Sequence, residues 1–306
     1  MPAIETPFRG IWPAMLTPLT ETLDIDADTF ARHAKELLAA GCTGITPFGT
    51  TGEGPSFTAA ERRAAIDGLV ARGIPAERII VSTSCAALPD TVELTRHALE
   101  IGAHGCLMLP PFFLKGVSDQ GVVDAYRWVI DRVADSRLRL YLYNIPQVSG
   151  VPLSRDVILE LKSRYPQTIV GLKDSGCQRD VSLGFADAFM QDVRVYVGNE
   201  PDLQCLSAHG STGAISGIAN IAPRLVERLV SQHGAPDAAR DQQRTLALLE
   251  ILNGYALTAA FKGVMALRHG NRGWMRVRPP LVALSDVEFA RLEGQLRDFG
   301  LDPLRD

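Results

Sequence analysis

The stretch IVGLKDS at residues 169–175 decides how this chain of 306 residues is interpreted. A short apolar run rich in β-branched residues is typical of a buried strand in a parallel sheet. Lys173 ends that run, although lysine is seldom deeply buried without a partner. Burial lowers the pKa of a lysine amine, and a neutral amine condenses with a ketone to give a Schiff base. The alternative is a lysine whose ammonium group reaches solvent at the strand end.

Short apolar runs alternate with amphipathic helical segments on both sides of this stretch. Eight such strand–helix units in about 230 residues predict parallel strands and match a (β/α)₈ barrel, an α/β fold. A doubly wound open sheet is the alternative, and it lacks the expected G-x-G-x-x-G turn after the first strand. The predicted strands are residues 11–16, 44–48, 78–82, 105–109, 138–143, 169–173, 193–197 and 213–216. The predicted helices are residues 28–41, 59–72, 91–101, 120–133, 155–164, 181–189, 202–209 and 223–232.

The remainder of the chain is expected to be helical. Residues 239–269 have a strong helical pattern, and residues 287–299 form a second helical segment. Because no low-complexity linker precedes them, they are expected to pack on the barrel. The predicted organisation is therefore a catalytic (β/α)₈ barrel at residues 1–232 and a C-terminal helical extension at residues 233–306.

Composition and residue spacing limit which partners and which cellular compartment are expected for the protein. The formal charge is −4 without a concentrated basic run, which does not favour a nucleic-acid partner. No apolar stretch approaches membrane-spanning length, and residues 1–15 contain no apolar signal core. The six histidines lack metal-ligand spacing, so no metal site is expected. The five cysteines are expected to be small buried side chains in a reducing compartment, and the protein is expected to be cytoplasmic.

Three motifs stand where predicted strands end, which is where a barrel of this kind carries its chemistry. GTTGEG follows the second strand at residues 49–54, and its glycines and two hydroxyls suit a carboxylate or phosphate. YNIP ends the fifth strand at residues 143–146, where a phenol can move protons. GLKDS ends the sixth strand at residues 171–175. An ordinary Gly/Thr turn and a tyrosine at the rim of the core are the alternatives for the first two motifs.

Taken together and in this order, GTTGE, YNIP and GLKDS resemble the dihydrodipicolinate synthase / N-acetylneuraminate lyase family. The resemblance covers essentially the whole chain. It implies a (β/α)₈ barrel and a class I, metal-free mechanism in which a lysine forms a Schiff base with pyruvate or another 2-keto acid. It also implies that no cofactor is needed and that the protein is a homo-oligomer, either a dimer or a tetramer.

The resemblance assigns a role to single residues. Lys173 matches the Schiff-base lysine, and Tyr143 matches the tyrosine that carries protons to and from the intermediate. Thr50 and Thr51 match the pair that binds the pyruvyl carboxylate, and Thr50 also matches a hydrogen-bond partner of the tyrosine. Two further positions, Gly49 and Ile215, are expected to line the substrate site through their backbone.

Departures from the family pattern bear on the substrate. The synthase proper has an arginine two residues beyond the YNxP proline, where this chain has Val148, and an isopropyl group cannot bind a carboxylate. The synthase also has a tyrosine in a P-Y-Y segment that reaches across a subunit interface, whereas this chain has Phe112 and Phe113. After the seventh strand, Asn199 and Glu200 are expected to bind acceptor hydroxyls. The alternative for Glu200 is a residue of the first helical turn that is favoured by the helix dipole.

The favoured function is a lyase that cleaves or forms a 2-keto acid of the 3-deoxy sugar acid type, with pyruvate as one half and an aldehyde as the other. The acceptor side is expected to favour an uncharged, hydroxylated aldehyde. Two enzymatic alternatives are dihydrodipicolinate synthase proper and a hydro-lyase that expels water through the same imine. A third alternative is a barrel that binds a keto acid without turnover, as a regulatory protein.

Overall fold

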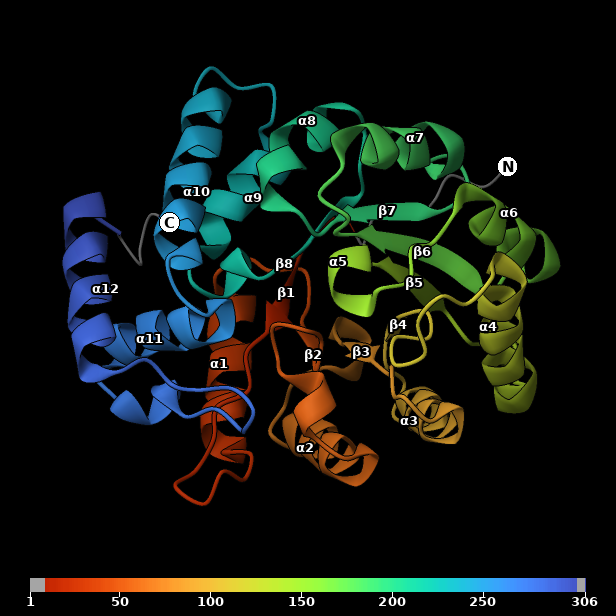
Figure 1. Ribbon diagram of the computed structural model, residues 1–306, viewed down its shortest axis with the longest axis horizontal. Coiled ribbons are helices and arrows are strands. Elements are labelled where there is room, and N and C mark those ends of the chain that lie inside the picture. Colours follow the sequence, from red (N-terminus) through yellow and green to blue (C-terminus); the bar gives the residue numbers. More distant parts are fainter. Residues whose placement is uncertain (1–8, 302–305) are drawn as a thin grey trace.

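The computed structural model describes residues 9–301 and 306 and forms a nearly closed barrel of eight parallel strands (Figure 1). No signal core was expected in residues 1–15, and residues 1–8 of that segment lie outside the described residues. The order around the sheet is β2-β1-β8-β7-β6-β5-β4-β3. The strands are β1 Gly10–Met15, β2 Thr46–Pro47, β3 Ile80–Ser82, β4 Gly105–Met108, β5 Leu140–Asn144, β6 Ile169–Asp174, β7 Arg194–Val197 and β8 Gly213–Ser216. The predicted (β/α)₈ barrel is confirmed.

The two ends of the sheet meet beside β2 and β3. A parallel bridge joins Ile45 to Ile79, and the Ile80 amide donates to the Ile45 carbonyl at 3.0 Å. These contacts satisfy backbone groups that would otherwise form an exposed edge. The carboxyl ends of all eight strands therefore lie around one rim.

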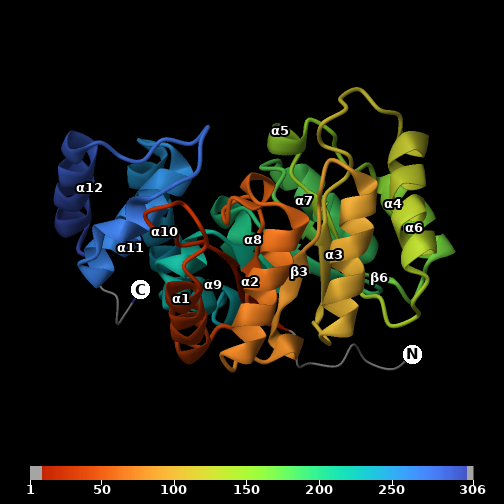
Figure 2. The same ribbon diagram turned by 90° about the horizontal axis from the view of Figure 1, so that it is seen from below.

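A helix follows each strand and covers the outside of the barrel (Figure 2). Local sequence sets several of the helix boundaries. Thr58 forms a capping box with Glu61 at one helix start, and the Ser154 side chain accepts a hydrogen bond from the amide of Val157 at another. The short helix α5 was not predicted. The helices are α1 Ala27–Ala39, α2 Ala59–Ala71, α3 Leu88–Glu100, α4 Asp119–Val133, α5 Pro146–Ser149, α6 Arg155–Arg164, α7 Arg179–Phe189, α8 Leu203–Ala208 and α9 Pro223–Ser231. Single 3₁₀ turns are η2 Gly54–Ser56, η3 Ala76–Arg78, η4 Glu200–Asp202, η5 Ile218–Asn220 and η6 Arg272–Met275.

Three further helices lie together on one side of the barrel in both views (Figures 1 and 2). They are α10 Ala238–Asn253, α11 Leu257–His269 and α12 Asp286–Phe299. The region 239–269 is therefore two helices, because Gly254 ends α10 and residues 255–256 turn the chain before α11. The division of the chain after residue 232 stays a prediction. Within the described part of the chain, no helix combines the length and apolar character that crossing a membrane needs.

The barrel interior is a small aromatic core, separate from the larger core between strands and helices. Tyr141 is fully buried in it, and its hydroxyl is 2.7 Å from Nε2 of His104. Burial lowers the pKa of His104 to about 4. A Cβ atom at Gly171 would lie 2.1 Å from Cδ1 of Tyr141, so glycine is needed for this packing. The filled interior leaves the rim of the strands as the place for a site.

Candidate active site

A cavity of about 690 Å³ opens at the carboxyl ends of the strands. Its size suits a small-molecule ligand. Among the predicted site residues, it brings together Thr50, Thr51, Tyr143, Val148, Lys173, Glu200 and Ile215. Asn199, the neighbour of Glu200, also lines it, as do Ile145 and Ser175 of the YNIP and GLKDS motifs. Its wall further includes residues to which the sequence analysis gave no role, namely Gln147, Cys177, Arg179, Gly198, Pro201, Asp202, Gly217, Leu249, Asn253, Leu257 and Phe261. Two predicted residues, Gly49 and Phe113, are not part of this wall.

Lys173 and Tyr143 face each other across neighbouring strands. They are directly paired in the register of β5 and β6, and Nζ of Lys173 lies 4.1 Å from the centre of the Tyr143 ring. Each residue is only 4% exposed. Within residues 9–301 and 306, the Lys173 amine has no ion pair and no hydrogen bond. The two strands therefore bring a phenol and a buried amine without a hydrogen-bond partner to the same cavity.

Gly198, just after β7, makes room for the lysine. A Cβ atom at this position would lie 2.7 Å from Cε of Lys173 and 2.0 Å from Oγ of Ser175. Any larger residue would push the lysine stem away from its present position. This close approach depends on a contact between two strands, so the local sequence around Gly198 did not reveal it.

The residue after the lysine anchors the loop. The Asp174 carboxylate is 4% exposed and accepts hydrogen bonds from Asn144 at 2.7 Å, from the Gly176 amide at 3.0 Å and from the Ser182 hydroxyl. Asn144 in turn accepts from the amide of Leu153 at 3.0 Å. These contacts hold the end of β6 against the end of β5 and thereby fix the direction of the lysine.

The GTTGE loop presents both threonines to the cavity. Thr50 is exposed and Thr51 half-buried, and both line the wall. Among the described residues, no hydrogen bond joins Thr50 to Tyr143. The expected contact between Thr50 and the tyrosine therefore stays a prediction. Gly49 lies behind the loop, where its carbonyl accepts from the Gly54 amide at 3.1 Å.

The last residue of that motif forms a buried ion pair with the C-terminal helices. Glu53 has a left-handed backbone (φ 58°), and its carboxylate contacts the amine of Lys262 on α11. Both side chains are fully buried, and Nζ of Lys262 also donates to the Arg276 carbonyl at 2.7 Å. Burial lowers the pKa of Lys262, and the negative charge of Glu53 opposes that shift. The pair joins the threonine loop to α11.

Glu200 combines features of its two expected roles, a residue of the acceptor site and a residue of a first helical turn. It begins a 3₁₀ turn, and its Oε1 accepts from the Ser216 hydroxyl at 2.6 Å and from the Gly217 amide at 3.1 Å. The carboxylate is therefore tied to the loop after β8 while the residue still lines the cavity. This arrangement places a negative charge in the cavity wall at a fixed position.

The first residue of α7 supplies a positive charge to the same wall. Nε of Arg179 donates to Oδ1 of Asp202 at 2.7 Å, and Nδ2 of Asn199 donates to the other oxygen at 2.7 Å. The Asp202 side chain is 6% exposed, whereas that of Arg179 is 57% exposed. Sequence patterns did not single out Arg179, because an arginine at a helix start is common and its partner is 23 residues away.

Phe113 lies elsewhere, and Val148 faces the cavity without a polar contact. Phe113 is 76% exposed and lines a separate, largely apolar cavity of about 510 Å³ together with Phe112 and Leu114. Val148 is 51% exposed. Within one described chain, then, the PPFFL segment contributes nothing to the cavity that contains Lys173.

The cysteines differ from the expectation of small buried side chains. Cys42 and Cys106 are buried, but Cys177 and Cys205 are exposed. Cys177 lines the active-site cavity with a left-handed backbone (φ 55°), and its thiol donates to Oδ1 of Asn199 at 3.3 Å. The expectation was wrong for these two residues: Cys177 stands in the loop between β6 and α7, and Cys205 stands on α8.

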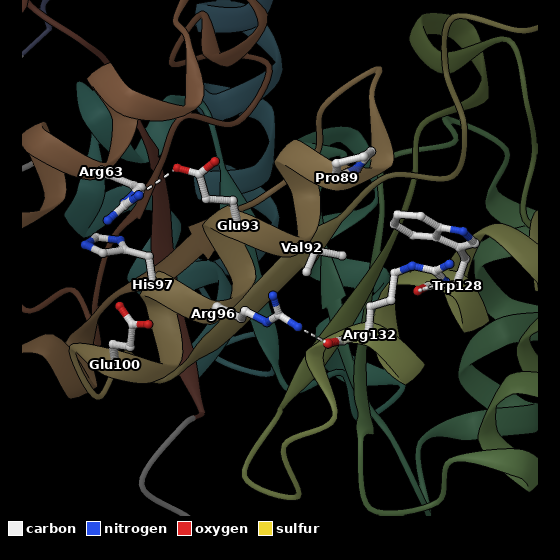
Figure 3. A pocket seen from close by; sticks show the side chains of 9 residues that line it. All are labelled: Arg63, Pro89, Val92, Glu93, Arg96, His97, Glu100, Trp128 and Arg132. Atoms are coloured by element: carbon white, nitrogen blue, oxygen red, sulfur yellow. Dashed lines mark hydrogen bonds and ion pairs between the residues drawn. The ribbon is translucent and has the colours of Figure 1, made fainter.

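A further hollow on the helical exterior has a different character (Figure 3). It lies between α2, α3 and α4, with a volume of about 460 Å³. Two of its arginines have partners within the hollow: Arg63 pairs with Glu93 at 2.6 Å, and the Arg132 guanidinium lies 3.6 Å from the centre of the Trp128 ring. Its lining residues stand on helices and include neither lysine nor tyrosine, so we take the cavity at the rim as the candidate active site.

Comparison with known proteins agrees with this geometry. The model of the dihydrodipicolinate synthetase family matches residues 7–298. An uncharacterized DapA-like lyase of Chloroflexus aurantiacus is 33% identical over 288 residues, covering 93% of this chain and 94% of the relative. The crystal structure of dihydrodipicolinate synthase from Agrobacterium tumefaciens is similar with a TM-score of 0.89 and 31% identity, covering 95% of this chain and 99% of that one. YagE, a family member from E. coli K12 crystallised with pyruvate, gives a TM-score of 0.86 at 26% identity, covering 96% and 99%.

Fold and site together define a class I, pyruvate-dependent lyase or aldolase built on a (β/α)₈ barrel. Enzymes of this class use a lysine and need no cofactor for the carbon–carbon chemistry. The chain belongs to the dihydrodipicolinate synthetase family.

Proposed function

We propose that the protein cleaves or forms a 2-keto-3-deoxy acid through a covalent imine on Lys173, with pyruvate as one half. One observation carries the proposal: the unpaired amine of Lys173 lies 4.1 Å from the ring of Tyr143, in a cavity that both threonines of GTTGE also line. The structure of YagE with pyruvate supports pyruvate as the small keto acid. The imine itself supplies the electron sink, so neither a cofactor nor a metal takes part in the proposal.

The chemistry follows from these positions. The Lys173 amine adds to the C2 carbonyl of the keto acid and water leaves, which gives a protonated imine. Tyr143 then takes the proton from the C4 hydroxyl while the C3–C4 bond breaks, and the electron pair of that bond forms an enamine. An aldehyde leaves, C3 accepts a proton, and water hydrolyses the imine to pyruvate and the free amine. Thr50 and Thr51 bind the carboxylate throughout.

The substrate assignment rests on the acceptor side of the cavity. Glu200, Asn199 and Gln147 offer hydrogen-bonding groups there, which suits a hydroxylated aldehyde. Val148 stands where the synthase proper has its arginine, and no tyrosine of this chain enters the cavity from residues 112–114. A sugar-acid lyase is therefore favoured over dihydrodipicolinate synthase proper. The same imine also serves a hydro-lyase, which differs in releasing no pyruvate.

Assembly and compartment belong to the same proposal. Phe113 and Leu114 are 76% and 67% exposed beside the apolar cavity of the PPFFL segment, which supports burial against a second copy in a homodimer or homotetramer. All five cysteines are free thiols, which supports a cytoplasmic location. Sedimentation analysis of the purified protein tests the assembly: a monomer at micromolar concentration would contradict it.

Borohydride trapping tests the covalent step. Pyruvate plus borohydride should add a reduced pyruvyl group to Lys173, identified by peptide mass spectrometry, also in the presence of EDTA. A panel of 2-keto-3-deoxy acids, read out by pyruvate release, then separates a lyase from a hydro-lyase, and aspartate semialdehyde with pyruvate tests for the synthase. An adduct on Lys35, Lys115, Lys162 or Lys262 instead would overturn the assignment of Lys173.

A further inference from the structure

The acceptor side of the cavity contains a fixed cation that the known motifs of the chain do not account for. Lys173 and Arg179 are the two cationic side chains among the described residues of the cavity wall. Lys173 is the proposed covalent site, which leaves Arg179 without an assigned role. It is the first residue of α7, six residues after Lys173, at the end of the loop that follows β6.

A contact with a buried carboxylate fixes one side of the Arg179 guanidinium. Asp202 is buried, and both of its oxygens are engaged, one by Nε of Arg179 and the other by Asn199. The arginine guanidinium has five N–H donors in one plane. Because Arg179 contacts Asp202 through Nε, its two Nη groups remain available to a ligand. Within the described residues these Nη groups have no hydrogen bond, and the side chain is 57% exposed in the cavity wall. A guanidinium held in this way needs little further ordering to bind an anion.

We propose that Arg179 binds a carboxylate at the far end of the acceptor aldehyde, so that the substrate is a dicarboxylic 2-keto-3-deoxy acid. This inference rests on the proposed lyase function and names its substrate class. The free edge of one guanidinium matches the two oxygens of one carboxylate. A phosphate dianion fits less well, because Glu200 places a negative charge in the same wall. The hydroxyls between the two ends then face Glu200 and Asn199.

This assignment changes the expectation drawn from Val148. The absence of arginine at position 148 indicated an uncharged acceptor, but that reasoning considered one position only. Arg179 offers the cation from another loop, after β6 rather than after β5. A different origin of the cation implies a different position of the acceptor carboxylate and hence a different acceptor from the semialdehyde of the synthase.

Three aldehydes that differ only at the distal carbon test the inference. Glyceraldehyde ends in a hydroxymethyl group, 2-hydroxy-3-oxopropanoate ends in a carboxylate, and glyceraldehyde 3-phosphate ends in a phosphate. Each is condensed with pyruvate, and kcat/KM is measured. We expect the carboxylate to be preferred over glyceraldehyde by roughly tenfold to a hundredfold, the scale of a charge-assisted hydrogen bond. An absent preference overturns the inference, and a preference for the phosphate overturns the carboxylate assignment.

Variants locate the preference. Arg179→Gln should reduce the preference toward unity, because it should raise KM for the carboxylated aldehyde much more than KM for glyceraldehyde, and Arg179→Lys should retain part of the preference. Arg155→Gln is the matched control, because Arg155 is also the first residue of a barrel helix but is exposed and outside the cavity. Retention of the preference in Arg179→Gln overturns the inference.

Trapping with pyruvate and borohydride on the same preparations separates this inference from the proposed function. Pyruvate does not reach the distal carbon, so Arg179→Gln should be trapped at Lys173 like the wild type, which also shows that the variant is folded. Trapping at Lys173 without a carboxylate preference defeats the role of Arg179 alone. No trapping at Lys173 in the wild type defeats the proposed lyase function.

Discussion

Two buried lysines of this chain have opposite surroundings. Lys173 lies at the end of β6, open to the cavity, opposite the ring of Tyr143 and without a carboxylate partner among the described residues. Lys262 lies on α11, fully buried, in contact with the carboxylate of Glu53 and 2.7 Å from a backbone carbonyl. Both side chains left water on folding, but only one faces a space that a substrate can enter.

The difference is a reason to expect that burial alone does not make a lysine a nucleophile. A buried ammonium that contacts a carboxylate and a carbonyl is expected to remain charged and structural, because its loss would leave the carboxylate uncompensated. A buried amine that lacks such partners and opens to a cavity can exchange its proton and react. The structure therefore predicts that chemistry and stability separate between the two lysines, and the experiments below test that separation from the largest effect to the smallest.

Removal of the Lys173 amine should have the largest effect on turnover. Lys173→Met keeps an unbranched chain of similar length but has no nucleophile, and turnover should fall by about 10⁴-fold or more. Borohydride trapping should disappear together with it. Peptide mass spectrometry of this variant is the sharpest test, because an adduct that moves to Lys262 would remove the contrast between the two lysines.

Tyr143→Phe should have the next largest effect. The ring that lies beside Lys173 remains, but the acidic proton is lost, and loss of a general acid/base costs about 10²–10⁴-fold in rate. Imine trapping should persist more than turnover does, since Thr50 and Thr51 are unchanged. Steady-state kinetics and trapping are measured on the same samples, and unchanged turnover would refute the role of the phenol.

Sequence reasoning reached one of the two lysines, and the reason is physical. Lys173 and Tyr143 stand at the ends of apolar strands, so a local pattern indicated both their burial and their position at the rim. The partner of Lys262 is Glu53, more than 200 residues away, and no local pattern reports such a contact. The same holds for Arg179 at the start of α7 and Asp202 in η4, which are 23 residues apart. The eight strand–helix units were predictable because their periodicity is local, whereas pairs between distant loops were not.

Gly198→Ala should disturb Lys173 without removing any functional group. The added methyl group would lie 2.7 Å from Cε of Lys173, closer than non-bonded carbon atoms can approach. A shift of the amine by about 1 Å costs on the order of 10²-fold in rate. Gly184→Ala on α7 is the control, because an added Cβ there meets nothing within 4 Å. Equal turnover of the two variants would show that the lysine tolerates displacement.

Breaking the Glu53–Lys262 pair should have the smallest effect on the chemistry and a large effect on stability. Lys262→Met or Glu53→Gln leaves one buried partner uncompensated, which costs about 3–5 kcal/mol in the free energy of unfolding. The double variant should recover part of that loss, because no charge remains unpaired. Equilibrium unfolding in urea measures the three variants, and Arg63→Gln, which breaks an exposed pair, should cost at most about 1 kcal/mol.

The kinetic result for the same variants completes the contrast. Pyruvate should still be trapped on Lys173 in Lys262→Met, and turnover should fall by no more than about tenfold, because the pair touches the reaction only through the loop that carries Thr50 and Thr51. The change should appear mainly as a higher KM for pyruvate, because Thr50 and Thr51 of that loop are proposed to bind its carboxylate. A loss of trapping in a variant that unfolds cooperatively would mean that Lys262 takes part in the chemistry, and the two lysines would then have to be treated as one site.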